Sequence, residues 1–212
     1  MVIGLLAIIA IPTVDGVSHA ISAQKDIEKR KADAKRMAKF HIDVYCDAPS
    51  SLLPQIHQHR LVLHHSRVYL GPIGATNPCK EGYVAEAFYI EYPDPERVPE
   101  VLGLVSQVQV DPPLLNWLYV DKDTMELRYG NKSASIEHRV GPWDWSEDEE
   151  GVEFEKDDKF AAVEVNVGGK KRWQVYWDDK ENGLQGHVPK GKRKFGISLE
   201  RTMIVVEEQE KK

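Results

Sequence analysis

The amino-acid sequence predicts a mainly β fold: a single antiparallel sandwich or barrel-like domain preceded by an N-terminal helix. The length of 212 residues suits one globular domain. Several short segments alternate apolar and polar residues with a period of two, which is the pattern of half-buried strands. Turn-forming residues separate these segments, and this order favours an antiparallel over a parallel sheet.

The net charge of −6 is distributed unevenly along the chain. Residues 1–40 hold seven basic and four acidic side chains, a balance of +3, which leaves −9 for residues 41–212. We therefore divide the chain into an apolar leader (1–20), a basic helix (21–40), an antiparallel β domain (41–206) and a charged tail (207–212). The acidic balance predicts no nucleic-acid partner, and two cysteines are too few for a Cys-based zinc module.

The apolar leader begins MVIGLLAIIAIPTV and has three interpretations. Pro12 and Asp15 interrupt it too early for a helix that crosses a bilayer, which leaves an anchor-like role at the membrane surface. The triplet at 18–20, Ser-His-Ala, resembles a signal-peptide cleavage site, but no Lys or Arg precedes the apolar run. The third interpretation is a segment packed on the body. The missing basic start favours a cytoplasmic or peripheral-membrane location over secretion.

Residues 22–40 contain no Gly or Pro and many good helix formers, so they predict a helix. A narrow apolar stripe recurs at three-, four- and seven-residue spacings, and it consists of Ile27, Ala34, Met37 and Ala38. Basic side chains cover the other faces. Residues 1–40 are thus expected either to contact an anionic membrane or to pack through the stripe on the body.

Strand signals follow from residue 41 to residue 200. The expected strands are residues 41–46, 60–63, 68–70, 88–92, 115–120, 125–129, 161–167, 171–177 and 195–200. A turn at 64–67 joins the second to the third. Gly168-Gly169 is the strongest hairpin signal in the chain.

Histidines are the first candidates for chemistry. His57 and His59 lie two residues apart, so on a strand they would share one face, and His64 lies close by. These three are weak candidates for metal ligands, because no Cys or carboxylate stands at a supporting spacing. We expect loop or edge histidines instead, with no metal and no cofactor.

The cysteines and the catalytic motifs give no active site. Cys46 and Cys79 would form a disulfide only in an oxidising compartment, and otherwise Cys46 is expected to be a buried structural thiol. The sequence contains no nucleophile elbow, no phosphate-binding loop and no dinucleotide fingerprint. It therefore predicts no catalytic residue and favours a protein that is not an enzyme.

Two tryptophans beside a run of carboxylates form the candidate binding site. Nine carboxylates lie between residues 144 and 158, with Lys156 as the only cation. The alternation of an extended segment would place both indoles on one side. The predicted contact residues are Trp143, Asp144, Trp145, Glu147, Asp148, Glu149 and Glu150. Alternatively, the tryptophans are core anchors and the acidic run is a solvated loop.

This site supports three hypotheses of function. The leading one is a binding module without enzymatic activity, whose partner is a protein or peptide, preferably basic, bound through charge and cation–π contacts. Aromatic rings flanked by carboxylates also bind sugars, so the second is a secreted or membrane-associated protein or effector that acts on glycans. The third is a membrane-tethered scaffold.

Several stretches together resemble a known group of proteins. They are CDAPS at 46–50, FYIEYPD at 88–94, DPPLLNWLYVDKDTMELRYGN at 111–131, SASIEHRVGPWDWSEDEEG at 133–151 and ISLER at 197–201. In these stretches the chain resembles a family of small uncharacterised proteins of filamentous ascomycete fungi, which also begin with an apolar leader and a charged helix. The family has no assigned activity, so the resemblance implies a fungal source and no catalytic residues.

Overall fold

The computed structural model of the protein describes residues 29–47, 49, 51–72, 74–75, 77, 82–109 and 113–204. Residues 29–36 are helical and fall within one unit, Met1–Arg36, whereas every strand of the described residues lies in a second unit, Met37–Lys212. The helix ends at Arg36, four residues earlier than predicted. Phe40 instead begins the first strand, where its ring is fully buried. The predictions for residues 1–28 and 207–212 lie outside the described residues.

The described part of the second unit contains thirteen strands and two short helices. They are β1 (Phe40–Tyr45), α2 (Leu53–Ile56), β2 (His59–His64), β3 (Arg67–Pro72), β4 (Tyr83–Val84), β5 (Glu86–Glu91), β6 (Leu102–Gln109), β7 (Leu114–Val120), β8 (Leu127–Gly130), α3 (Lys132–Ser135), β9 (Trp143–Trp145), β10 (Val152–Phe154), β11 (Phe160–Val167), β12 (Lys170–Trp177) and β13 (Lys194–Met203).

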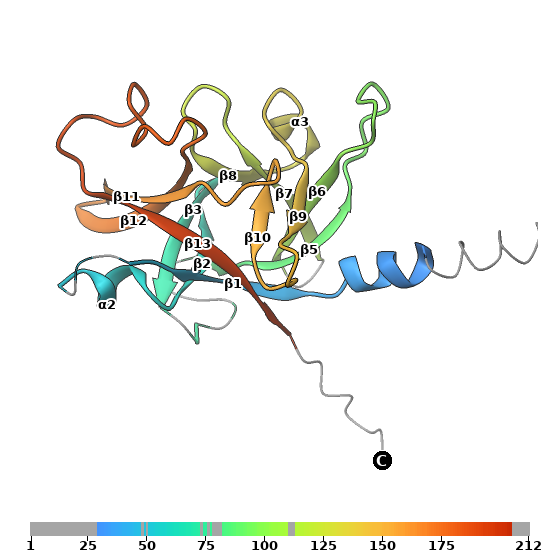
Figure 1. Ribbon diagram of the computed structural model, residues 1–212, viewed down its shortest axis with the longest axis horizontal. Helices are drawn as coiled ribbons and strands as arrows, with labels where there is room; N and C mark the ends of the chain where they lie inside the picture. The colour runs from blue at the N-terminus through green and yellow to red at the C-terminus, as the bar shows by residue number, and fades with distance from the viewer. Residues whose placement is uncertain are drawn as a thin grey trace, which may run out of the picture. The chain divides into compact units, whose positions relative to one another are not determined.

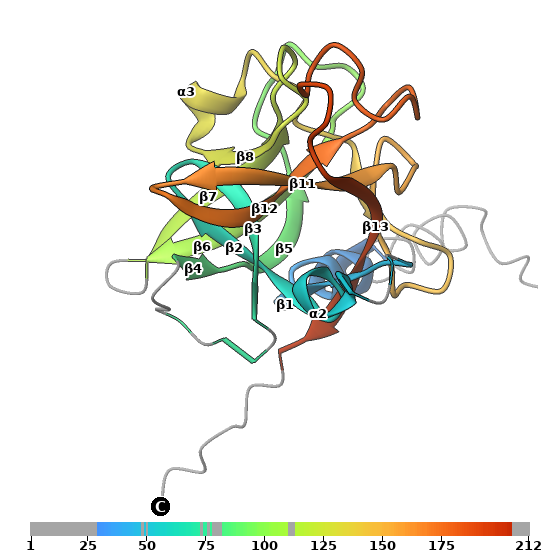
Figure 2. The same cartoon turned by 90° about the vertical axis from the view of Figure 1, so that its left-hand side faces the viewer.

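Nine of these strands close into an antiparallel barrel, in the order β12–β11–β13–β1–β5–β6–β7–β8–β3. The ring closes where β12 meets β3, at the pair Gln174 and Tyr69. β2 pairs with both β1 and β3, β4 pairs with β2, and β9 and β10 form a separate two-stranded sheet. β13 runs beside β1 in space, although β1 is the first and β13 the last strand in the sequence (Figure 1, Figure 2). The mainly β, barrel-like prediction is confirmed.

Turn residues and alternation located most strands. Gly168 and Gly169 both adopt positive φ angles, 59° and 80°, in the tight turn between β11 and β12. His65 and Ser66, in the predicted turn between β2 and β3, also have positive φ. β6 was not among the expected strands. Its two faces are both buried, so its sequence shows no clear alternation.

The core has two parts. The main cluster fills the barrel with one side of each surrounding strand, and Leu104 of β6 belongs to it. A smaller cluster covers the opposite face of β5, β6 and β7 and includes Val105 and Trp117. The hydroxyl groups of Tyr92 and Ser135 lie 2.8 Å apart and join this outer cluster to α3. The strands β5–β7 are thus buried on both sides, which fixes their register.

Asp43 is a buried carboxylate that joins three neighbouring strands. Arg60 of β2 donates two hydrogen bonds to it, at 2.6 and 3.0 Å, and the Thr202 hydroxyl of β13 donates a third at 2.6 Å. Burial opposes ionisation of this group, but these hydrogen bonds prevail and lower the pKa of Asp43 below its ordinary value. Asp43 therefore remains ionised, and the guanidinium of Arg60 balances its charge inside the sheet.

Candidate functional site

The predicted acidic site lies on the β9–β10 hairpin. Its pairs are Trp143 with Phe154 and Trp145 with Val152, so both indoles lie on the same side of β9, as the alternation predicts. That side faces the core: Trp143 is part of the main cluster, and Trp145 is half-buried against it. The carboxylates of the connecting loop lie above this apolar contact.

Trp143 is a core residue and is therefore unavailable as a contact residue. Its side chain has 0% exposure, and its ring packs 4.7 Å from Phe154 and 6.0 Å from Phe160, measured between ring centroids. Both phenylalanines also contact Trp177, at 5.1 and 4.9 Å. Burial of a large aromatic side chain contributes several kcal/mol to folding, so the folded chain buries Trp143 in the core and does not leave it exposed for a partner. Trp143 thus anchors the hairpin to the barrel.

Trp145 lies at the border between core and surface. Its ring meets Tyr89 edge-on, with centroids 5.6 Å apart, and the guanidinium of Arg201 lies 4.5 Å from its centroid. Arg201 also donates hydrogen bonds from its side chain to the Glu149 carbonyl and from its backbone N–H to the Glu150 carbonyl, the latter at 2.7 Å. An internal cation therefore already stacks on Trp145 and fixes the acidic loop to β13.

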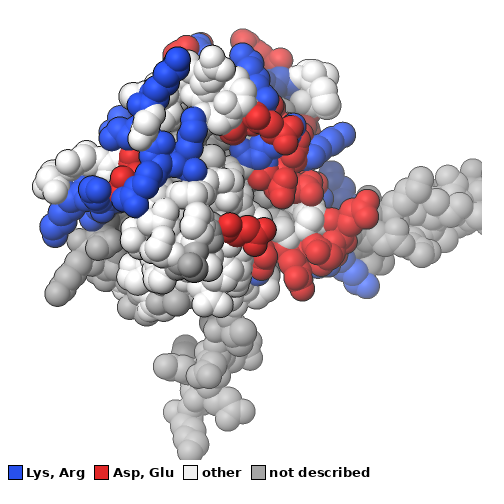
Figure 3. All heavy atoms as spheres, turned by 60° about the vertical axis from the view of Figure 1, so that its left-hand side comes forward, with Lys and Arg blue, Asp and Glu red and all other residues white. Residues whose placement is uncertain are grey.

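A hollow of about 420 Å³ lies between this loop and β13, and we call it the acidic hollow. Its charged lining consists of Asp148, Glu150, Glu153, Asp157, Asp158 and Glu200, with Lys156 as the single cation. Figure 3 shows acidic side chains gathered on one part of the surface and basic side chains on another. The predicted loop residue Glu147 is exposed beside it, whereas Asp144 and Glu149 are partly buried.

The loop is ordered by its own polar groups. Asp148 accepts hydrogen bonds from the Ser146 hydroxyl at 2.5 Å and from the Glu150 N–H at 3.1 Å, and these lower its pKa. The pKa of Glu200, in contrast, is raised, first by burial and then by the negative charges of Glu150 and Asp148. The hollow thus holds negative charge that its own residues do not balance.

Two side chains of the basic stretch at residues 190–194, Arg193 and Lys194, bind groups outside the acidic loop. Arg193 forms an ion pair with Glu164 of β11, and Lys171 lies 3.6 Å from the same carboxylate. These groups line a separate hollow together with Lys190 and Lys192. The loop contacts Arg201 instead, which the sequence could not indicate because it lies 52 residues from Glu149 along the chain.

The weak metal candidates do not converge. His57 precedes β2 and its Nδ1 accepts the Cys46 N–H at 3.3 Å, whereas His59 begins the strand after Gln58, whose φ is +55°. His64 lies at the other end of β2, against the ring of His65. Among the residues that the structure describes, no three His, Cys, Asp or Glu side chains are arranged to hold a metal ion. Cys46 carries a free thiol, and Cys79 lies outside the described residues.

The apolar leader lies outside the described residues, so the membrane, signal and glycan hypotheses that depend on it stay predictions. Within the described ranges, no helix has the length and apolar character needed to span a bilayer. Comparison with known proteins gives one match: residues 16–205 match a family model described as a fungal beta-trefoil domain. This is consistent with the fungal resemblance of the sequence. No curated protein and no solved structure matches the chain.

Proposed function

Because the chain belongs to the fungal beta-trefoil domain family, whose fold is often used in binding modules, we propose that this protein is a binding module without enzymatic activity. Its partner is a protein segment rich in Lys and Arg, and its contact surface is the acidic hollow with the adjoining loop.

Unbalanced negative charge around a concave surface is the observation that supports this proposal. Six carboxylates line the hollow against one lysine, and within the described part of the chain only Asp157 of the six forms an ion pair, with Lys159 outside the hollow. The charges of Glu150 and Asp148 contribute to the raised pKa of Glu200. A cationic side chain placed there would relieve this repulsion. Such a field also attracts a basic partner from a distance and speeds its association.

The rigidity of the loop supports the proposal as well. Arg201, Ser146 and the backbone of residues 149–151 hold the loop in place before any partner arrives. A preformed surface loses little conformational entropy on binding, so more of the attraction is available as affinity. Trp145 contributes from below by positioning Arg201.

The test uses a fluorescent eight-residue peptide of alternating Lys and Val, titrated with the full chain while anisotropy is measured. The variant Glu147→Gln, Glu150→Gln, Glu153→Gln removes three charges and no side-chain hydrogen bond of the loop. At about 0.5 kcal/mol for each exposed pair, the loss of three should weaken binding about tenfold. Raising the salt concentration should weaken binding to the unmodified chain more than to the variant.

The matched control is Glu91→Gln, Glu96→Gln, Glu100→Gln, which removes three exposed carboxylates from β5 and the connection to β6. It changes the net charge equally, so it should leave the affinity within about twofold if the acidic hollow is the site. Equal weakening by both variants would mean that only overall charge matters, and the proposed site would be wrong.

A further inference from the structure

We infer that the basic partner segment binds as an extended strand, added to an open edge of β13 at residues 194–197. This inference rests on the proposed function for the charge of the partner, and it adds the conformation and the place of binding. Its basis is the pairing of β13, the direction of its backbone groups and the groove beside it.

β13 is flanked on both sides along only part of its length. Residues 198–203 pair with β1, which ends at Tyr45 opposite Ser198. Residues 194–197 pair with β11 on one side. On their other side, no strand of the described part of the chain pairs with them. Among the residues that the structure describes, none forms a strand in the position next to this four-residue segment that β1 occupies further along β13.

The backbone groups of Gly196 and Lys194 point toward this open position. The Arg193 carbonyl accepts a hydrogen bond from the Glu164 N–H of β11, so odd-numbered residues of β13 bond toward β11. The Ile204 N–H bonds instead to the Lys39 carbonyl on the β1 side, as the alternation requires for even numbers. The N–H and C=O of residues 194 and 196 are therefore available to a new strand.

Gly196 leaves the face of the sheet beside this edge uncovered. It is exposed, and a Cβ built on it would meet no atom within 4 Å. Its conformation is not one that requires glycine, because its φ is not among the positive values. A glycine inside a strand often marks a place where another backbone approaches closely. Here the open space lies beside an unpaired edge.

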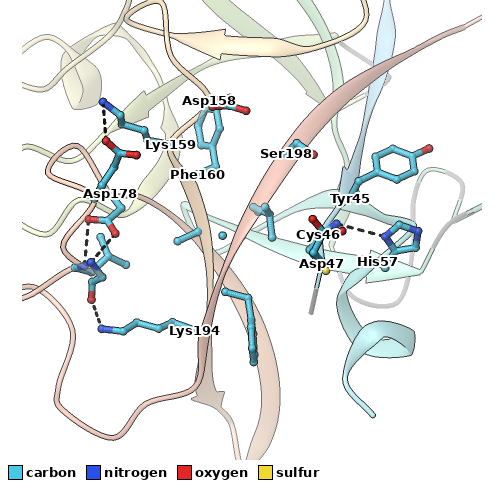
Figure 4. A pocket seen from close by; sticks show the side chains of 17 residues that line it. Tyr45, Cys46, Asp47, His57, Asp158, Lys159, Phe160, Asp178, Lys194 and Ser198 are labelled. Carbon is cyan, nitrogen blue, oxygen red and sulfur yellow. Dashed lines mark hydrogen bonds and ion pairs between the residues drawn. The ribbon is translucent and has the colours of Figure 1, made fainter. Parts of the chain in front are cut away.

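A groove of about 770 Å³ runs along this edge. Its lining includes Phe195, which is partly buried, and the core residues Phe160 and Ile197, which are 2% and 5% exposed, and Tyr45, Cys46 and His57 line the opposite wall (Figure 4). The groove and the acidic hollow share Asp158 and Ser198, so the two form one continuous surface along β13. A strand of alternating apolar and basic side chains fits both, because its apolar side chains all lie on one face and its basic side chains on the other. The apolar face would contact the groove and the basic face the carboxylates.

The charges of the groove also select a cationic strand. Its lysines are already engaged: Lys159 pairs with Asp157 at 2.5 Å, and Lys194 donates to the Gly183 carbonyl. The carboxylates of Asp47 and Asp158 are exposed at its rim. A basic side chain of the bound strand would find a counter-charge there and in the acidic hollow.

The test combines two substitutions at one position. Gly196→Pro removes the N–H that faces the open edge and no hydrogen bond of the free protein, whereas Gly196→Val keeps that N–H. We expect Gly196→Pro to weaken binding of the Lys-Val peptide about tenfold and Gly196→Val to change it less than about threefold. Thermal unfolding of both variants checks that the fold is retained.

Hydrogen exchange on the unmodified chain keeps the inference testable even if Gly196→Pro does not fold. Saturating peptide should slow exchange of the Gly196 and Lys194 amides at least about tenfold and leave Ile197, which already bonds toward β11, unchanged. A peptide with every second amide N-methylated should bind about tenfold more weakly if its edge pairs with β13.

The outcomes separate the two proposals. Tenfold weakening by the Glu147, Glu150 and Glu153 variant, with no effect of Gly196→Pro or N-methylation and no slowed amides, would support the proposed function and overturn strand addition. Slowed Gly196 and Lys194 amides with no effect of the charge variant would overturn the acidic hollow as the site. Absence of peptide binding to the unmodified chain would overturn both.

Discussion

Asp43→Asn tests whether a buried ion pair joins the first, second and last strands of the body. The substitution keeps the shape of the side chain and removes its charge. Arg60, whose side chain is 11% exposed, would then remain without a counter-charge. Thr202 would lose a charged acceptor for its hydroxyl group.

The expected cost follows from these contacts. Removing one member of a buried ion pair lowers the free energy of unfolding by about 3–5 kcal/mol, and each hydrogen bond to a charged group contributes about 1.5–3 kcal/mol. Asparagine keeps one oxygen that accepts a hydrogen bond, so we expect the lower end. The free energy of unfolding at pH 7 should fall by about 3 kcal/mol.

Guanidinium chloride unfolding measures this cost, and a second background isolates the pair. In Arg60→Met, Asp43 is itself a buried charge without a counter-charge, so Asp43→Asn should cost less than about 1 kcal/mol there or should stabilise the fold. A cost below about 1 kcal/mol in the unmodified chain, or equal costs in the two backgrounds, would refute the reasoning.

The pH dependence gives an independent check. The folded pKa of Asp43 lies below its ordinary value, so the folded state binds fewer protons than the unfolded state between the two values. Its contribution is complete above pH about 4 and is lost as the pH falls through the folded pKa. The stability difference between the unmodified chain and Asp43→Asn should therefore narrow below pH about 4.

Two further predictions concern other buried groups. Burial lowers the pKa of His41, so the contribution of His41 to stability is present above pH about 6.5 and is lost as the pH falls below that value. His41→Gln should therefore reduce the change in the free energy of unfolding between about pH 7 and pH 5. An unchanged pH dependence of this free energy would contradict the prediction. Trp143→Ala should lower the free energy of unfolding by about 3–5 kcal/mol and Trp145→Ala by about 1–2 kcal/mol in denaturant titrations, whereas similar costs would place both indoles in the same environment.

Alternation and turn residues predict most of the strands. The β1 sequence FHIDVY and the β11–β12 hairpin show alternation or tight-turn residues, and both are local properties. β6 was not predicted because Leu104 and Val105 are buried on opposite faces and, unlike β5 and β7, which are buried in the same way, it has no aromatic residue that marks a strand. Its second buried face depends on the outer cluster, which is built from residues distant in sequence.

The candidate site was predictable in composition but not in geometry. The acidic run is contiguous in the sequence and could be recognised there. Glu200 joins it only because β13 passes under the loop. The exposure of Trp143 could not be known either, since it depends on Phe160 and Trp177 from other strands. The open edge at Gly196 follows from the residue at which β1 ends, and a pattern of side chains does not reveal that register.

The pairing of β1 with β13 also constrains how this chain is made. Thr202 and Asp43, which share a hydrogen bond, lie 159 residues apart. During synthesis β1 leaves the ribosome long before its neighbour exists, and the barrel cannot close until β13 emerges. Contacts this distant in sequence slow folding, and an unpaired edge is prone to wrong pairing. Nascent chains that stop before β13 should therefore be the species that chaperones and proteases recognise.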